Sequence, residues 1–300
     1  MGGFDNFRSS PYVSSAAFVP FSKPDYYFPP QNAERYSGYV DLKLTCCTDI
    51  YIGSGFSHMP ENGKQLVYQT MTYDGKAVIP GSSFKGVVRN LASAVSNSCL
   101  PFLPRYGKDG PAKYPAGISN ISCKDGKFCI VCDIFGAMSK GSKVMFSDMY
   151  SENAIFYIKE LNAQYGPKPV YTDKHGTAKG YKFFMTGENS YEMPSKIKAR
   201  VVKKGAVFTG RVHFKKITEE ELALLMFSLG LNDMEGQDIV LKIGGFKNEG
   251  MGEVKVSACD FVCSNMLNKS AGELAYQYYD MPTANQDAIE KISDEILTPV

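Results

Sequence analysis

Several features that would place this chain in a familiar class are missing. No run of about 18 apolar residues occurs, which excludes a membrane-spanning helix. The first residues, MGGFDNFRSS, lack a basic segment followed by an apolar stretch, so we expect no secretion signal and a cytoplasmic protein. The formal net charge is only +2, so the basic excess that marks many nucleic-acid-binding proteins is also absent. Any surface that binds a polyanion must therefore be local.

Two enzyme motifs are missing as well. None of the three histidines, His58, His175 and His213, begins the His-x-Glu sequence that a zinc deaminase needs to bind its metal and move protons. The glycine-rich stretch near residue 245 lacks the Gly-Lys-Ser/Thr ending of a Walker A loop. The sequence thus favours neither a zinc deaminase nor a P-loop nucleotidase.

The eight cysteines predict a metal site rather than disulfides, because nothing in the chain indicates an oxidising compartment. Cys129 and Cys132 form a Cys-x-x-Cys pair, Cys123 lies six residues earlier, and Cys99 could return from the end of a helix. Four thiolates would hold one structural zinc ion in a tetrahedral site. His58 or His175 could replace Cys99, and the alternative interpretation is four free buried thiols.

The other four cysteines lie near predicted strands, where we expect small hydrophobic side chains. They are Cys46, Cys47, Cys259 and Cys263.

The pattern of apolar residues predicts an α+β protein. The predicted elements run strand, hairpin at Asp74-Gly75, helix 84–96, long insertion, strand, helix, strand, glycine loop, strand, which is close to a ferredoxin-like βαββαβ plan. Thr218 and Glu221 form a capping box at the second helix.

The predicted organisation has three parts. They are an extended arm (1–35), a core (36–263) and a C-terminal helical tail of surface helices (264–300), and the core includes a cysteine-bearing insertion (97–143) and a long excursion (160–200).

The first helix begins at Pro80-Gly81-Ser82-Ser83, a candidate phosphate-binding site. Ser82 or Ser83 is the expected cap, and the free N–H groups and dipole of a helix start favour an anion. Lys85 and Arg89 lie four residues apart and project together, adding positive charge. The plainer interpretation is a capped helix with two solvated cations.

Two further segments are candidates for binding a polynucleotide. In the loop Gly244–Gly252, Gly244 and Gly245 let a backbone approach phosphate, Phe246 could stack on a base and Lys247 adds charge, although the glycines could serve only a turn. In the 160–200 excursion, lysines including Lys174, Lys179 and Lys182 alternate with aromatic residues, which suits a single strand, although a solvated loop has the same composition.

Three segments together resemble the RAMP superfamily of CRISPR effector complexes. They are IPGSSFKGVVRNLASAV (79–95), CIVCDIFGA (129–137) and KIGGFKNEGMGEVKV (242–256), in the order that the family has them. The details are similar to the backbone subunits of type III and derived complexes. The resemblance implies a ferredoxin-like core with a zinc-binding insertion, several copies stacked along a guide RNA, a thumb hairpin in the 160–200 excursion, and contacts with target RNA and other effector subunits.

Active subunits of this family carry an Asp a dozen or so residues before the Pro-Gly-Ser helix. The matching stretch here, Gln65–Thr70, holds no acid. We therefore expect a subunit that does not cleave, with cleavage left to a separate nuclease. The alternative is a metal-dependent ribonuclease that uses Glu61 or Asp74. Guide processing with His58 as base, and a structural zinc protein that binds only proteins, are further alternatives.

Overall fold

The computed structural model describes residues 16–298, except 62, 64, 104–111, 164–170, 188–194, 232–238 and 265–266. Parts of the predicted arm, insertion and excursion therefore lie outside the described residues. The strands are β1 (Ala16–Val19), β2 (Tyr36–Cys46), β3 (Gly53–His58), β4 (Val67–Thr70), β5 (Thr72–Tyr73), β6 (Lys76–Ile79), β7 (Val144–Phe146), β8 (Met149–Ser151), β9 (Phe156–Asn162), β10 (Tyr181–Phe184), β11 (Lys196–Val202), β12 (Val207–Ile217), β13 (Val240–Lys242) and β14 (Glu253–Cys263). The helices are α1 (Gly81–Ala94), α2 (Ile130–Phe135), α3 (Glu219–Ser228), α4 (Ala271–Gln277) and α5 (Gln286–Lys291), with 3-10 turns η5 (Lys247–Glu249) and η6 (Tyr278–Asp280) and the π-helix η7 (Ile292–Ile296).

The largest sheet forms the centre of the molecule. Its strand order is β13-β14-β2-β12-β8-β6-β5, with β7 also paired to β12, and all these pairs are antiparallel. In β2 the side chains of Val40, Leu42 and Leu44 are buried, and the residues between them face the other side of the sheet. The alternation of apolar and polar residues in this strand therefore places one apolar face toward the helices.

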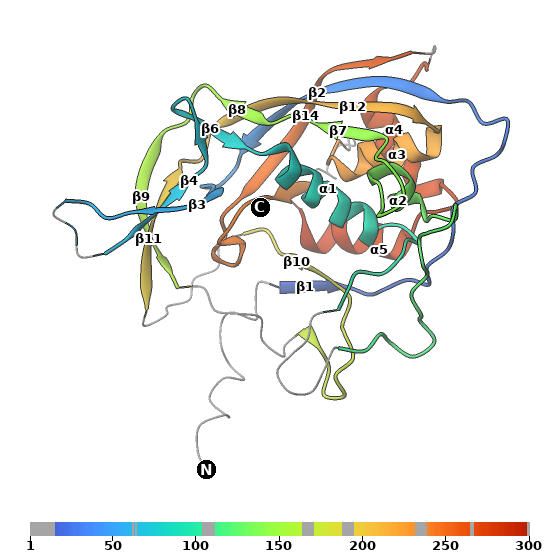
Figure 1. Cartoon of the computed structure of the whole chain (residues 1–300), viewed down its shortest axis with the longest axis horizontal. Helices are drawn as coiled ribbons and strands as arrows, with labels where there is room; N and C mark the ends of the chain where they lie inside the picture. Colours follow the sequence, from blue (N-terminus) through green and yellow to red (C-terminus); the bar gives the residue numbers. More distant parts are fainter. Residues whose placement is uncertain are drawn as a thin grey trace.

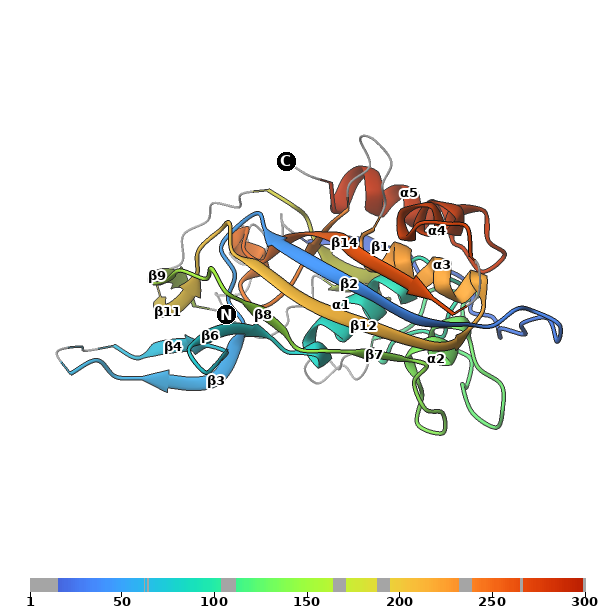
Figure 2. The same cartoon turned by 90° about the horizontal axis from the view of Figure 1, so that it is seen from above.

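Helices cover that apolar face (Figures 1 and 2). Phe84, Val88 and Leu91 of α1 are buried at helical spacing, so the helix turns one apolar face toward the sheet. The capping box at α3 is confirmed, since the Thr218 hydroxyl accepts from the Glu221 N–H and the Glu221 carboxylate accepts from the Thr218 N–H. The predicted α+β class is confirmed, with mostly antiparallel sheets.

The C-terminal helices are not a separate surface tail, which corrects the sequence-based expectation. Helix α4 packs on α3, and Tyr278 and Ile292 are fully buried in the same apolar core as the large sheet. Ile289, Ile292 and Ile296 recur at helical spacing between charged residues, so one face of this segment is apolar and packs on the core.

A second sheet, here called the finger sheet, projects from one end of the molecule (Figures 1 and 2). Its strand order is β3-β4-β11-β9, with β4 and β11 parallel and the other pairs antiparallel. A small apolar cluster that includes Leu161, Val201 and Phe246 joins its inner face to the loop after β13.

The described part of the 160–200 segment is not one hairpin excursion, which is a second correction. Strands β9 and β11 belong to the finger sheet, whereas β10 between them pairs with β1 of the arm. Tyr181 and Phe183 of β10 are buried in the main core. Alternate aromatic residues of this lysine-rich segment therefore anchor it to the body of the protein.

The predicted Asp74-Gly75 turn is confirmed. It joins β5 to β6, and both residues have positive φ (48° and 77°), as a tight hairpin turn requires. Among the described residues, no helix is both long and apolar enough to cross a membrane.

Candidate nucleic-acid interface

Helix α1 begins at Gly81, three residues earlier than predicted, and its N-terminus already holds an anion. The Gly81 N–H donates to the Asp148 carboxylate at 2.7 Å, and no side chain of the helix caps it. A Cβ at Gly81 would lie 2.3 Å from the Phe146 carbonyl oxygen, so this position needs glycine. The prediction that Ser82 or Ser83 caps the helix is wrong, because Asp148 stabilises the positive end of the helix dipole instead.

The exposed flank of α1 lines a hollow of about 290 Å³, here called the lysine hollow. Three lysines from distant parts of the chain meet there: Lys182 of β10, Lys242 of β13 and Lys247 of the glycine loop. Its full lining is Ser83, Gly86, Val87, Asn90, Leu91, Lys182, Phe183, Phe184, Leu241, Lys242, Lys247 and Leu297. Two of the segments predicted to bind a polynucleotide, and one flank of the third, thus converge at one place.

The lysine hollow has more positive than negative charge. Burial, and then the charge of Lys247, lowers the pKa of Lys182 to about 8. Burial and the charge of Lys242 lower the pKa of Lys247. Burial lowers the pKa of Lys242 too, and there Glu253 opposes the shift from 3.2 Å. A bound anion would offset the repulsion between these ammonium groups.

Aromatic rings hold Lys182 in place. Its Nζ lies 4.3 Å from the ring centroid of Tyr171 and 4.1 Å from that of Phe184, and it donates a hydrogen bond to the Tyr171 hydroxyl. The exposed Lys179 lies over Phe18 of β1, with its Nζ 5.5 Å from the ring centroid. Lys174 is exposed in a turn, and neither Lys174 nor Lys179 lines the lysine hollow.

Lys85 and Arg89 lie together, as predicted, but on the opposite flank of α1. Lys85 Nζ donates to the Ser142 hydroxyl at 2.8 Å, and Arg89 Nη2 lies 3.7 Å from the sulfur of Cys132. Burial, and then the charge of Arg89, lowers the pKa of Lys85. The two cations therefore face the cysteine-bearing segment and not the lysine hollow.

The glycine loop packs against the protein itself. A Cβ at Gly244 would lie 2.3 Å from the Tyr51 carbonyl oxygen, and the Gly245 N–H donates to the same oxygen at 2.8 Å. Phe246 is only 8% exposed, in a tilted contact with the Tyr51 ring. The prediction that Phe246 stacks on a base does not fit this buried position, because its ring fills the cluster under the finger sheet.

The four predicted cysteines do converge. The sulfur atoms of Cys99, Cys123, Cys129 and Cys132, here called the cysteine cluster, all lie within 4.8 Å of one another, and those of Cys99 and Cys132 are 3.6 Å apart. The Cys132 N–H donates to the sulfur of Cys129, and the neighbouring thiols of Cys123, Cys132 and Cys99 hold the pKa of Cys129 far below its ordinary value. This set of donors could hold one metal ion, and its chemistry is that of a closed zinc site with four thiolate ligands.

Cys99 completes this cluster, so no histidine is needed in its place. His58 and His175 are exposed on β3 and in a turn, outside the cluster. The expectation of small buried hydrophobes holds for Cys46, whereas Cys47 and Cys259 are exposed, because their side chains point away from the core.

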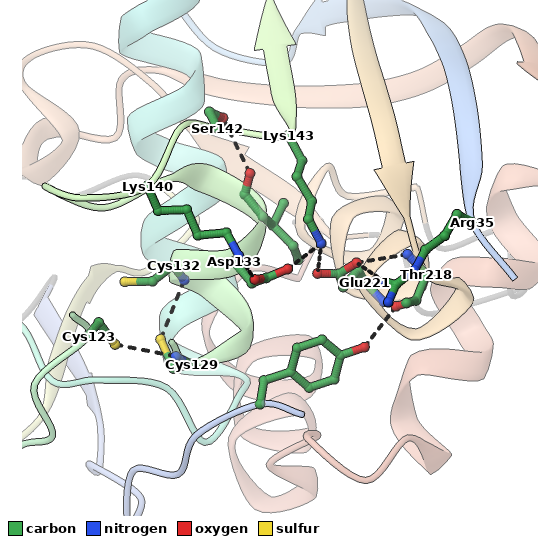
Figure 3. A network of polar contacts seen from close by, with 12 residues as sticks. Arg35, Cys123, Cys129, Cys132, Asp133, Lys140, Ser142, Lys143, Thr218 and Glu221 are labelled. Atoms are coloured by element: carbon green, nitrogen blue, oxygen red, sulfur yellow. Dashed lines mark hydrogen bonds and ion pairs between the residues drawn. The ribbon is translucent and has the colours of Figure 1, made fainter. Parts of the chain in front are cut away.

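A buried ionic network, missed by the sequence analysis, continues from the cysteine cluster (Figure 3). Asp133, next to Cys132, accepts from Lys140 and Lys143, and Lys143 also donates to the fully buried Glu221 at 2.7 Å. Burial, then a hydrogen bond with Asp133, raises the pKa of Glu221 to about 7. The network links α2 to the start of α3. In the sequence, the capping box already accounted for Glu221, so nothing in the sequence indicated its contacts with Asp133 and Lys143.

The two candidate catalytic acids are both exposed. Glu61 lies beyond the end of β3, and Asp74 lies in the β5–β6 turn. Among the described residues, the cysteine cluster is the one group of three or more His, Cys, Asp or Glu side chains placed to hold a metal ion.

Comparison with known families identifies the chain. The model of the RAMP superfamily matches residues 43–255, which is more than two thirds of the sequence. The chain belongs to the RAMP superfamily. No curated protein matches it. The match spans β2 to β14, so it includes α1, the cysteine cluster and the glycine loop of this RAMP protein.

A chain of one solved structure is similar to this protein. It comes from a structure titled "Cryo-EM structure of the Type III-B Cmr-beta bound to cognate target RNA". The two chains are 14% identical with a TM-score of 0.40, and the match covers 76% of the RAMP protein described here but only 61% of the other chain.

Proposed function

We propose that this RAMP protein is the guide-RNA-binding backbone subunit of a CRISPR ribonucleoprotein effector of type III or a type III-derived kind. Copies assemble along the guide and hold the guide–target RNA duplex. The subunit itself does not cleave, and a separate nuclease subunit does. The observation that supports this proposal is the lysine hollow, where Lys182, Lys242 and Lys247 gather beside the exposed flank of α1 with Glu253 paired to Lys242.

The hollow suits the backbone of a nucleic acid rather than its bases. Lysine is a compact charge that attracts phosphate without selecting a sequence. The neighbouring Ser83, Gly86 and Asn90 are small or neutral, so a sugar-phosphate chain could approach α1 closely. RNA contact is thus proposed along the flank of the helix rather than at its N-terminus, where Asp148 is bound.

The proposal is tested by neutralising Lys182 and Lys247, for which no carboxylate partner is found among the described residues. We expect Lys182→Gln/Lys247→Gln to weaken binding of single-stranded RNA. We also expect the slope of log affinity against log salt concentration to become shallower by about 1.4, since each phosphate contact on a single strand contributes about 0.7. The matched control is Lys43→Gln/Lys215→Gln, which removes two exposed lysines from β2 and β12. Equal slopes for the two variants would contradict the proposal.

We infer a ferredoxin-like plan for the core. The strand order β14-β2-β12, continued by β7 and β8, and the positions of α1 and α3 between strands support it. We also infer that the cysteine cluster holds structural zinc, with one equivalent of metal per chain. Metal content of the wild type and of Cys129→Ser/Cys132→Ser measures this directly.

The absence of cleavage is part of the proposal. Incubating the assembled complex with complementary RNA and Mg²⁺ should leave the RNA intact unless the separate nuclease is added. Regularly spaced cuts that vanish in Glu61→Ala or Asp74→Ala would instead support the ribonuclease alternative and identify the acid.

A further inference from the structure

The small net charge of this protein conceals two surfaces of opposite sign. Residues 271–300 contain six Asp or Glu and one Lys, a net charge of −5. The other 270 residues contain 32 Lys or Arg and 25 Asp or Glu, a net charge of +7. This separation needs a physical explanation, because an acidic surface repels the RNA that the rest of the protein is proposed to bind.

All six carboxylates of the C-terminal segment are exposed and form what we call the acidic surface. They are Glu273, Asp280, Asp287, Glu290, Asp294 and Glu295. The acidic surface includes a hollow of about 310 Å³, where Glu290 and Asp294 lie beside Tyr276 and Tyr279. Tyr276 is 51% exposed. Carboxylates next to an exposed aromatic ring suit a lysine or arginine side chain of a partner.

The finger sheet carries the complementary charge. Lys196, Lys198 and Arg200 alternate along β11, so they lie on one face of the sheet, and the intervening Ala199 and Val201 are buried against the other face. We call these three residues the basic ladder.

The basic ladder has an apolar neighbour and two acidic neighbours. Ile158, opposite Arg200 on β9, is 57% exposed, and Glu160 lies opposite Lys198. Glu249 lies near Lys196, whose charge acts on its carboxyl group. The face thus presents cations around an exposed apolar residue, as protein interfaces often do.

The two surfaces lie toward opposite ends of the molecule. The finger sheet projects from one end, and α4 and α5 lie in the other half of the molecule in both views (Figures 1 and 2). One copy cannot bring them together within itself. A contact between the basic ladder of one copy and the acidic surface of the next would join copies head to tail.

We propose that this RAMP protein assembles by docking the basic ladder of one copy onto the acidic surface of a second copy. The proposal deepens the proposed function, since it names the surfaces that would join neighbouring subunits along RNA. The acidic surface then faces the neighbouring protein and not the polynucleotide, and the attraction is screened by salt.

Charge exchange tests the docking. In variant A, Glu290→Lys/Asp294→Lys reverses the acidic surface. In variant B, Lys198→Glu/Arg200→Glu reverses the basic ladder. Each variant alone should lose multi-subunit loading on a long single-stranded RNA by more than about tenfold, because like charges would meet at every junction. An equimolar mixture of A and B should restore loading, since opposite charges then meet at every junction.

Two controls separate assembly from folding and from RNA binding. Lys43→Glu/Lys215→Glu and Asp125→Lys/Glu152→Lys make the same charge changes at other exposed sites and should assemble like the wild type. Affinity for a short RNA that holds one subunit should stay the same in A and B. Restoration in the mixture also shows that both variants are folded.

Normal loading by either variant alone, or no restoration in the mixture, would overturn the docking. A loss of affinity for the short RNA by variant B as large as its loss of multi-subunit loading would also overturn it, because the basic ladder would then bind RNA. If the wild type binds no RNA at all, the proposed function fails. The exchange is then followed without RNA, by sedimentation at low ionic strength, where restoration in the mixture supports the docking and its absence overturns it.

Discussion

The two flanks of α1 differ in what they contact. One flank, with Ser83, Gly86 and Asn90, is small and exposed beside the lysine hollow, and its cations come from β10, β13 and the glycine loop. The other flank carries its own cations, Lys85 and Arg89, which reach toward Ser142 and the cysteine cluster. The charged residues of the helix thus serve its attachment to the cysteine-bearing segment, and its uncharged residues face the proposed ligand.

Removing cysteines from the cluster that faces Lys85 and Arg89, here called the cysteine flank of α1, should have the largest effect on stability and RNA binding. In Cys129→Ser/Cys132→Ser we expect loss of bound metal and a loss of stability of several kcal/mol, because metal binding contributes directly to the folding free energy. Thermal unfolding of the wild type with and without a chelator should show the same change. The variant should also lose RNA binding, since α1 is supported by this segment. An unchanged unfolding temperature would mean that the cluster is four free thiols.

Two glycines on α1 provide a closer comparison. Gly81→Ala should destabilise the protein by about 2 kcal/mol or more, because the new Cβ would meet the Phe146 carbonyl oxygen at 2.3 Å. Gly86 is exposed, and a Cβ at this position would have no neighbour within 4 Å, so Gly86→Ala should stabilise the helix by about 0.5–1 kcal/mol. Urea denaturation of both variants measures the difference. Equal effects would show that the start of α1 does not pack against the β7–β8 turn.

The fold was predictable where local pattern decides structure. The pattern of apolar residues gave the α+β class, a capping box located α3, and cysteine spacing located the cysteine cluster. The lysine hollow was predictable only in pieces, because Lys182, Lys242 and Lys247 are brought together by the pairing of β10 with β1 and β13 with β14. The cap at Gly81 was missed for the same reason, since Asp148 lies 67 residues away in sequence. The burial of Phe246 depends on the finger sheet, whose composition resembles that of a solvated loop.

The ionic network of Asp133, Lys143 and Glu221 should give a smaller effect on stability, which depends on pH. The folded-state pKa of Glu221 is raised to about 7, above its unfolded value, so the folded state binds the extra proton. Stability should therefore fall as pH rises from about 5 to 7, by roughly 1–3 kcal/mol. Glu221→Gln keeps the capping box and should flatten this dependence. Asp133→Asn removes a carboxylate from the same network and should instead destabilise the protein at both pH values, as urea denaturation at pH 5 and pH 8 would show.

The smallest expected effect is on RNA affinity and concerns the lysine hollow. It tests whether the charge of Lys182 contributes to RNA binding. The pKa of Lys182 is lowered to about 8 in a hollow where it faces Lys247 and the hydroxyl of Tyr171. Raising the pH from 7 to 9 removes its proton in the free protein, so RNA affinity should fall by about threefold, the contribution of one partly solvated charge. The side chain of Lys182→Arg stays charged over this range, so the affinity of this variant should fall less than that of the wild type. If the wild type and Lys182→Arg show the same pH profile in filter binding, Lys182 does not contact phosphate. The lysine hollow would then bind RNA through Lys242 and Lys247 alone.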